Sequence, residues 1–290
     1  MKRWGWTTGI IALLLVLAVL KLIEQHQASD RAYDSADGLL QEMALRRSGE
    51  KLQFDKDRLY EGDLLLVNGD YPIDPQSGVP DVVELSGQPE LTGGAVLLDN
   101  GIRLSRSVAL KFAVMVEAAS QEGVNHFMIS SAYRDQAEQS RLYKEKGADY
   151  ALPAGSSEHN LGLALDIGST QGKMSEQEEG KWLERHAAKY GFVLRYPADK
   201  TQVTGISFEP WHFRYVGLPH SIVMDRNNLV LEEYLELLAE KKAVSTTVEG
   251  RTYEILHYGP DELSEMQVPK GRDCVLSGDN KGGMVVTVYP

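Results

Sequence analysis

The sequence predicts an α+β fold. Helical and strand-like segments are mixed without a regular β-α-β rhythm, and no glycine-rich phosphate loop follows a strand. Residues 244–290 have strand-like alternation between Gly, Asp and Pro turns. Of the 290 residues, 42% are hydrophobic and 25% are charged. This is ordinary globular composition, with enough apolar residues for a large core.

Charge and cysteine content exclude some classes of protein. The net charge of −12 argues against duplex nucleic acid as a partner, because binding it usually needs a basic face. The single cysteine, Cys274, excludes a disulfide scaffold within the chain. It also lies far along the chain in the β-rich C-terminal segment, which argues against a cysteine nucleophile.

Residues 1–24 predict a transmembrane signal anchor. Lys2 and Arg3 precede a long apolar stretch in which Lys21 is the only charge. Such a stretch nearly spans a hydrocarbon core of about 30 Å, and the leading basic residues place the rest of the chain outside the cytoplasm. A cleaved signal peptide is the alternative, but residues 24–28 form a poor cleavage site. A buried core helix is disfavoured because the stretch is apolar on every face.

The remaining chain divides into three parts. Residues 25–58 are polar and predict a stalk, residues 59–243 predict the main α+β domain, and residues 244–290 predict a small β-rich appendage. We expect the main domain to open with a strand at Leu64–Val67, closed by an Asn-Gly-Asp turn.

Helices of the main domain are expected where apolar residues recur every three or four positions. In the first helix these residues run from Val108 to Ala119, and Gly123, Gly147 and Gly191 stop the first three helices. The expected helices cover residues 107–122, 135–146, 177–190 and 229–242. The expected strands cover residues 126–131, 164–167, 192–196 and 211–216, with 248–258 and 285–289 in the appendage.

Three short segments carry the candidate chemistry. The first places His159 and Asp166 on either side of a glycine-containing turn, and imidazole and carboxylate are good zinc ligands. The second, in an aromatic-rich strand, places Glu209 three residues before His212. A catalytic zinc takes three protein ligands and a water, whose proton a nearby carboxylate can accept. Each spacing by itself has low specificity.

The third segment joins a strand to a helix at Arg134. An arginine aimed at a zinc site can polarise a scissile carbonyl or bind a substrate carboxylate. An isolated arginine at such a junction is more often part of a surface or structural ion pair. A serine mechanism lacks support, because no G-x-S-x-G elbow occurs and the Ser48-x-x-Lys51 match lies in the polar stalk.

Taken together, these segments resemble the VanY-type zinc D-Ala-D-Ala carboxypeptidases and dipeptidases. Tyr133-Arg134, Ser157-x-His159-x6-Asp166 and Glu209-x2-His212 occur in the order and approximate spacing of that family. The resemblance extends from about residue 60 to residue 290, and residues 150–155, 158–160, 194–197, 209–212 and 214–220 are very close to it.

The resemblance implies a fold, a cofactor and roles for individual residues. The fold would be that of the hedgehog/D,D-peptidase domains, with one Zn²⁺ per chain held by His159, Asp166 and His212. Glu209 would be the general base and later the acid, and Arg134 would stabilise the oxyanion. Ser157 and Gln139 would contact the substrate.

The resemblance also implies a function. A membrane-anchored, extracytoplasmic hydrolase of this type removes the terminal D-Ala from peptidoglycan precursor peptides ending in D-Ala-D-Ala, the dipeptide that vancomycin-type antibiotics bind. One alternative is an L,D-carboxypeptidase or a cell-wall endopeptidase of the same zinc fold. Another is a non-catalytic, zinc-stabilised wall-binding protein, against which the intact Glu209 and Arg134 argue.

Overall fold

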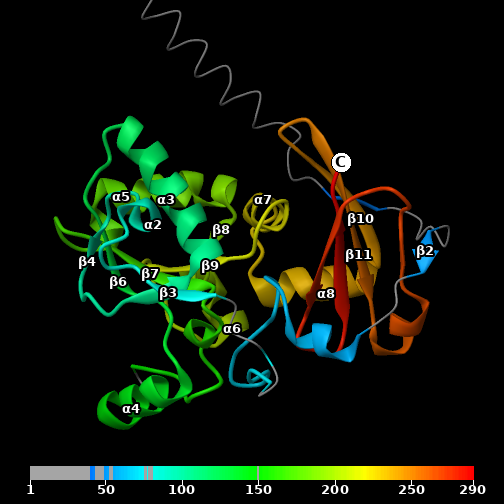
Figure 1. Ribbon diagram of the computed structural model, residues 1–290, viewed down its shortest axis with the longest axis horizontal. Coiled ribbons are helices and arrows are strands. Elements are labelled where there is room, and N and C mark those ends of the chain that lie inside the picture. The colour runs from blue at the N-terminus through cyan, green and yellow to red at the C-terminus, as the bar shows by residue number, and fades with distance from the viewer. Residues whose placement is uncertain (1–39, 43–48, 52–54, 75–76, 78–80, 149) are drawn as a thin grey trace, which may run out of the picture. The chain divides into compact units, whose positions relative to one another are not determined.

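The computed structural model describes residues 40–42, 49–51, 55–74, 77, 81–148 and 150–290. The predicted anchor at residues 1–24 and most of the predicted stalk at 25–58 lie outside the described residues. Among the residues that are described, no helix is both long and apolar enough to cross a membrane. The described chain has an α+β fold with two five-stranded sheets, which confirms the predicted class (Figure 1).

The first of these sheets, called the site sheet here, has the strand order β4-β6-β7-β9-β8. β4 and β6 are parallel, and the other neighbouring strands are antiparallel. A bulge between Ile129 and Ser131 interrupts the pairing of β6 with β7. Asp166 of β7 lies directly opposite His212 of β9, so both side chains emerge on one face. The strands are β4 (Val96–Leu97), β6 (Phe127–Ser131), β7 (Ala164–Ser169), β8 (Phe192–Leu194) and β9 (His212–Tyr215).

Helix α3 (Arg106–Gln121) supplies much of the core of the site sheet, as its apolar periodicity predicts. Phe112 and Met115 are fully buried and cluster with Ile129 and Leu165 of the strands. Shorter helices and one two-stranded sheet also belong to this part of the described chain. They are α2 (Pro89–Thr92), α4 (Gln136–Lys146), α5 (Glu178–His186), α6 (Thr201–Thr204), the 3-10 helices η2 (Glu158–Leu161), η3 (Met174–Glu176) and η5 (Ala198–Lys200), and the pair β3 (Val82–Glu84) and β5 (Arg103–Ser105).

The second sheet, called the C-terminal sheet here, is antiparallel throughout, with the order β1-β10-β11-β14-β13. Helix α8 (Leu231–Lys241) packs against β10 and β11, as Figure 1 shows. Tyr234 and Leu235 of α8 cluster with Ile255 of the sheet. The strands are β1 (Gln41–Glu42), β10 (Ala243–Val248), β11 (Arg251–Tyr258), β13 (Cys274–Gly278) and β14 (Met284–Val288).

Two strands of this region come from the segment predicted as a stalk. β1 pairs with β10, and β2 (Glu50–Lys51) pairs with β12 (Gln267–Val268). The 3-10 helices η1 (Lys56–Tyr60) and η6 (Pro260–Glu265) contribute Leu59 and Leu263 to a third apolar cluster. Helix α7 (His220–Arg226) precedes α8 in the sequence. It packs against the 3-10 helix η4 (Ala187–Tyr190).

The strand predicted at Leu64–Val67 is wrong. This segment is irregular, yet its side chains alternate between two cores: Leu64 and Leu66 join the α8 cluster, whereas Leu65 and Val67 join the site-sheet cluster. It forms no ladder because its backbone bonds to isolated partners, such as the carbonyl oxygen of Asp279, which accepts from the Leu66 amide. All four side chains are buried, and they point alternately into two cores without forming a strand.

The other expected elements of the main domain are confirmed, with ends shifted by a few residues. The helix expected at 177–190 is divided: α5 ends at His186, and η4 continues as a 3-10 turn to Gly191, whose φ is 89°. In the C-terminal sheet, β1, β10 and β13 were not predicted.

Candidate active site

Three potential metal ligands converge on one face of the site sheet. Asp166 and His212 face each other across β7 and β9, and His159 comes from η2, just before β7. One ligand atom from each residue lies within 4.8 Å of the others, and both histidines are buried. The structure thus brings together the three residues that the sequence analysis nominated as metal ligands.

Each imidazole is oriented by a hydrogen-bond partner on the side away from this centre. His159 Nδ1 lies 2.6 Å from the carbonyl oxygen of Ala132, so Nδ1–H donates there and Nε2 faces Asp166 Oδ2 at 3.5 Å. His212 Nδ1 faces Asp166 Oδ1 at 3.1 Å, and its Nε2 faces Glu158 Oε2 at 3.4 Å. Metal-binding histidines characteristically have such a second partner on the other ring nitrogen.

The donor set fits a zinc ion. Two atoms that each lie about 2.0–2.1 Å from a tetrahedral zinc are about 3.3 Å apart. The distances from the Asp166 oxygens to His212 Nδ1 and His159 Nε2, 3.1 and 3.5 Å, bracket that value. Burial would raise the pKa of Asp166, but the two imidazoles outweigh this effect and lower it, so the carboxylate is ionised and available as a ligand.

Glu209 provides a carboxylate beside the ligand group. Its Oε2 lies 3.8 Å from His212 Nδ1, and its side chain is 29% exposed, so it remains accessible to solvent. The amide of His212 donates to the carbonyl oxygen of Glu209, and the amide of Glu209 donates to that of Tyr196, which fixes the turn before β9. Burial raises the pKa of Glu209, an appropriate direction for a group that must both accept and release a proton.

Arg134 lies between β6 and α4, and its side chain is held in place. Its Nε donates to Gln139 Oε1 at 2.8 Å, and its Nη1 donates to Ser131 Oγ at 2.6 Å. The Arg134 amide donates to the carbonyl oxygen of His159, which ties the arginine to the ligand-bearing turn. Burial lowers the pKa of Arg134, whereas the nearby Asp166 opposes this effect; an arginine nevertheless remains protonated.

The two residues nominated for substrate contact occupy different surroundings. Gln139 is fully buried, and both ends of its amide are engaged, because Nε2 donates to the carbonyl oxygen of Leu152 at 2.6 Å while Oε1 accepts from Arg134. Both hydrogen bonds hold the amide of Gln139 beside Arg134. Ser157 is buried at the start of η2, where its carbonyl oxygen accepts from the amide of Asn160.

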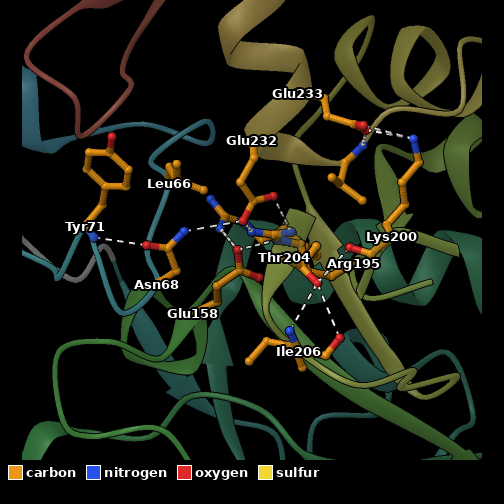
Figure 2. A network of polar contacts seen from close by, with 12 residues as sticks. Leu66, Asn68, Tyr71, Glu158, Arg195, Lys200, Thr204, Ile206, Glu232 and Glu233 are labelled. Atoms are coloured by element: carbon orange, nitrogen blue, oxygen red, sulfur yellow. Dashed lines mark hydrogen bonds and ion pairs between the residues drawn. The ribbon is translucent and has the colours of Figure 1, made fainter. Parts of the chain in front are cut away.

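A group of buried charges behind His212 was not predicted from the sequence. Glu158 forms ion pairs with Arg195 and Arg214. Arg195 also forms an ion pair with Glu232 of α8 (Figure 2). Burial would raise the pKa of Glu158, but the two arginines outweigh this effect and lower it. The available sequence signal was a charge within a buried strand, since Arg214 stands between Phe213 and Tyr215.

Comparison with known proteins gives consistent matches. The family model for VanY, D-alanyl-D-alanine carboxypeptidase, matches residues 101–218. A D-alanyl-D-alanine carboxypeptidase of Enterococcus faecium is 52% identical over 235 residues, covering 81% of this chain and 78% of that protein.

Two solved structures share the fold. The vancomycin-resistance D,D-dipeptidase VanXYg, in complex with a D-Ala-D-Ala phosphinate analogue, has a TM-score of 0.70 and 29% identity, covering 87% of this chain and all of that one. A VanY D,D-pentapeptidase from a VanB-type resistance cassette, in complex with Zn(II), has a TM-score of 0.51 and 31% identity, covering 60% of this chain and 99% of that one.

The fold and the site define a hydrolase with a histidine–aspartate–histidine metal-binding group and an adjacent carboxylate. The extent and identity of the match with the Enterococcus faecium protein decide the family. This chain belongs to the VanY family of D-alanyl-D-alanine carboxypeptidases.

Proposed function

We propose that this chain is a zinc D,D-carboxypeptidase that removes the C-terminal D-alanine from peptidoglycan precursor peptides ending in D-Ala-D-Ala. The observation that carries the proposal is the position of Glu209 beside the group of His159, Asp166 and His212. A hydrolytic zinc site needs three protein ligands and a group that manages the proton of a water. Membership in the VanY family supports the choice of substrate.

One zinc ion per chain would be held by His159, Asp166 and His212. Bound zinc would polarise the scissile carbonyl and lower the pKa of a water to about 7. The Zn(II) complex of the VanY relative supports zinc over other divalent metals that accept nitrogen and oxygen ligands.

Glu209 would move the proton that the reaction requires. It accepts a proton from the attacking water, whose oxygen forms a new bond to the carbonyl carbon. When the bond from that carbon to nitrogen breaks, Glu209 returns the proton to the leaving amine. The products are free D-alanine and a peptide shortened by one residue. The raised pKa of Glu209 suits both halves of this exchange.

Arg134 would donate to the oxygen of the scissile carbonyl as negative charge develops on it. Its hydrogen bonds to Gln139 and Ser131 would hold the guanidinium in position before the substrate arrives. Ser157, next to the buried Glu158 and two residues before His159, would contact the peptide. These assignments divide the work into charge stabilisation by Arg134 and proton transfer by Glu209.

Residues 1–24 would anchor the enzyme in the cell membrane with its catalytic domain outside the cytoplasm, where lipid-linked and wall-bound stem peptides occur. The support for this part is the basic-led apolar stretch in the sequence. Removal of the terminal D-alanine would destroy the dipeptide that vancomycin-type antibiotics bind, so the enzyme would contribute to resistance.

The deciding experiment incubates the full chain, purified in detergent, with a synthetic stem pentapeptide ending in D-Ala-D-Ala. We expect release of one D-alanine and a tetrapeptide, loss of activity with a chelator, and recovery with zinc. A stem tetrapeptide and a dimer of two cross-linked stem peptides are tested as substrates in parallel. Cleavage of either one without cleavage of the pentapeptide would replace the proposal by an L,D-carboxypeptidase or an endopeptidase. Binding of all three without turnover would indicate a wall-binding protein.

A further inference from the structure

Four charged side chains, called the charge network here, form a buried series of ion pairs between His212 and helix α8. Glu158 Oε1 accepts from Arg195 Nε at 2.7 Å and from Arg214 Nη1 at 2.9 Å. The two terminal nitrogens of Arg195 then donate to both oxygens of Glu232, at 2.7 and 2.9 Å (Figure 2). The members of this charge network lie in η2, β9 and α8, except for Arg195, which directly follows β8.

The charge network is neutral as a whole, and its charged groups are hydrogen-bonded to one another or to backbone carbonyl oxygens. The side chains of Glu158, Arg195 and Arg214 are at most 1% exposed, and that of Glu232 is 12% exposed. Two carboxylates and two guanidiniums carry no net charge together. The remaining Arg214 donors reach the carbonyl oxygens of Asp63, Leu65 and Tyr215. Loss of one member of such a set leaves an uncompensated buried charge.

The second oxygen of Glu158 faces the metal site. Glu158 Oε2 lies 3.4 Å from His212 Nε2, whereas the other ring nitrogen, Nδ1, lies 3.1 Å from Asp166. A carboxylate that accepts from Nε2–H leaves the lone pair on Nδ1, the nitrogen that faces Asp166 and Glu209. Both arginines bind Oε1, so Glu158 is fixed in the rotation that aims Oε2 at the imidazole.

We propose that Glu158 is a positioning residue that orients His212 toward the metal, and that Glu232 of α8 acts through Arg195 to keep Glu158 in place. Helix α8 packs against the C-terminal sheet, so that sheet is part of the support of the metal site. The proposal rests on the zinc site of the proposed function. It goes further by assigning a task to residues that contact neither metal nor substrate.

The test measures the zinc dissociation constant of the full chain in detergent, by competition with a chromophoric chelator. The informative variant is Glu232→Gln, which removes the charge of the network member farthest from His212. Its matched control is Glu233→Gln, because Glu233 is the next residue of α8 and pairs with Lys200 at 2.9 Å. The absorption spectrum of the cobalt-substituted protein reports the geometry of the site independently of activity.

We expect Glu158→Gln to raise the zinc dissociation constant by about 10- to 100-fold, as for other partners of metal-binding histidines. Glu232→Gln should raise it less, by roughly 3- to 10-fold, because it acts through Arg195. Both variants should alter the cobalt spectrum, and Glu233→Gln should change neither readout. In a double variant, Glu232→Gln should have no further effect once Glu158 is replaced.

The outcomes separate this proposal from the proposed function. A wild-type chain that binds no zinc would overturn the metal site and this proposal with it. Tight zinc binding that is unchanged in Glu232→Gln, or equally weakened in Glu233→Gln, would overturn the positioning role alone. If Glu158→Gln fails to fold, the comparison of the two α8 variants still decides.

Discussion

Asp166 and His212 are directly opposed residues of antiparallel strands, and Asp166 Oδ1 lies 3.1 Å from His212 Nδ1. The spacing of these two proposed ligands is therefore set by the hydrogen-bond register of β7 and β9. A slip of one residue would turn one of them to the opposite face of the sheet. A metal site built on paired strands is held more rigidly than one built on loops.

Replacement of His159 should remove both metal and activity. His159→Ala leaves two of the three protein ligands, so we expect the purified chain to hold far less than one zinc and to release no D-alanine. Zinc content is measured by atomic absorption after gel filtration. The control is His126→Ala, since His126 is exposed and lies outside the site. One tightly bound zinc in His159→Ala would refute its role as a ligand.

Glu209→Gln should separate chemistry from metal binding. The amide keeps the shape of the side chain but cannot accept the water proton, so kcat should fall by at least about 100-fold. Zinc content should remain at the wild-type level, because Glu209 is not one of the three ligands. Glu240→Gln, at an exposed position of α8, is the matched control. Near-normal turnover in Glu209→Gln would contradict the assignment of the base.

Arg134→Lys should lower kcat/KM by about 100- to 1,000-fold, the usual cost of losing a donor to the oxyanion. Lysine keeps the charge, but its ammonium lacks the planar set of N–H donors of a guanidinium. It therefore cannot hydrogen-bond to Gln139 and Ser131 and to a substrate at the same time. Gln139→Ala should have a smaller effect in the same direction, because it frees the guanidinium without removing it. Steady-state kinetics with the pentapeptide measures both. Equal activity of Arg134→Lys and wild type would exclude the proposed role.

Acid should destabilise the fold through His220. This histidine hydrogen-bonds with Tyr234 of α8 and Thr287 of β14, and burial lowers its pKa from 6.5 to about 3. Below pH 6.5 the unfolded chain therefore binds a proton that the folded chain does not. The free energy of unfolding should fall by about 1.4 kcal/mol for each pH unit below 6.5, until the pH approaches 3.

The measurement for His220 is chemical denaturation of the metal-free chain at several pH values. His220→Gln should be less stable at pH 7 but should lose less of its stability on acidification, since the titrating group is gone. The difference between the two pH slopes isolates His220 from the other titrating groups. Identical slopes would show that His220 is not the group responsible.

The structure agrees with the sequence-based predictions for helices, whose pattern of apolar residues lies within one segment of the chain. The periodicity from Val108 to Ala119 predicted α3, and the helix predicted at 135–146 is α4. In the structure, Asp135 caps α4 through a capping box with Glu138. A helix carries its pattern within one segment, so few distant residues are needed to recognise it. The strand predicted at Leu64–Val67 is wrong for the opposite reason, since this apolar run fills two separate cores that only the folded chain creates.

The mixture of helical and strand-like segments was enough to predict the α+β class, because each pattern lies within a short segment. The candidate ligands and the chemistry came from the resemblance of three motifs to a known family, since each spacing has low specificity when taken alone. Only the tertiary structure decided the pairing of Asp166 with His212 and the task of Glu158. Glu158 pairs with Arg195, which is 37 residues away in the sequence, and with Arg214, which is 56 residues away. Arg195 pairs with Glu232, a further 37 residues away. A buried charge is stable only with a partner, and distance along the chain does not reveal which residue that partner is.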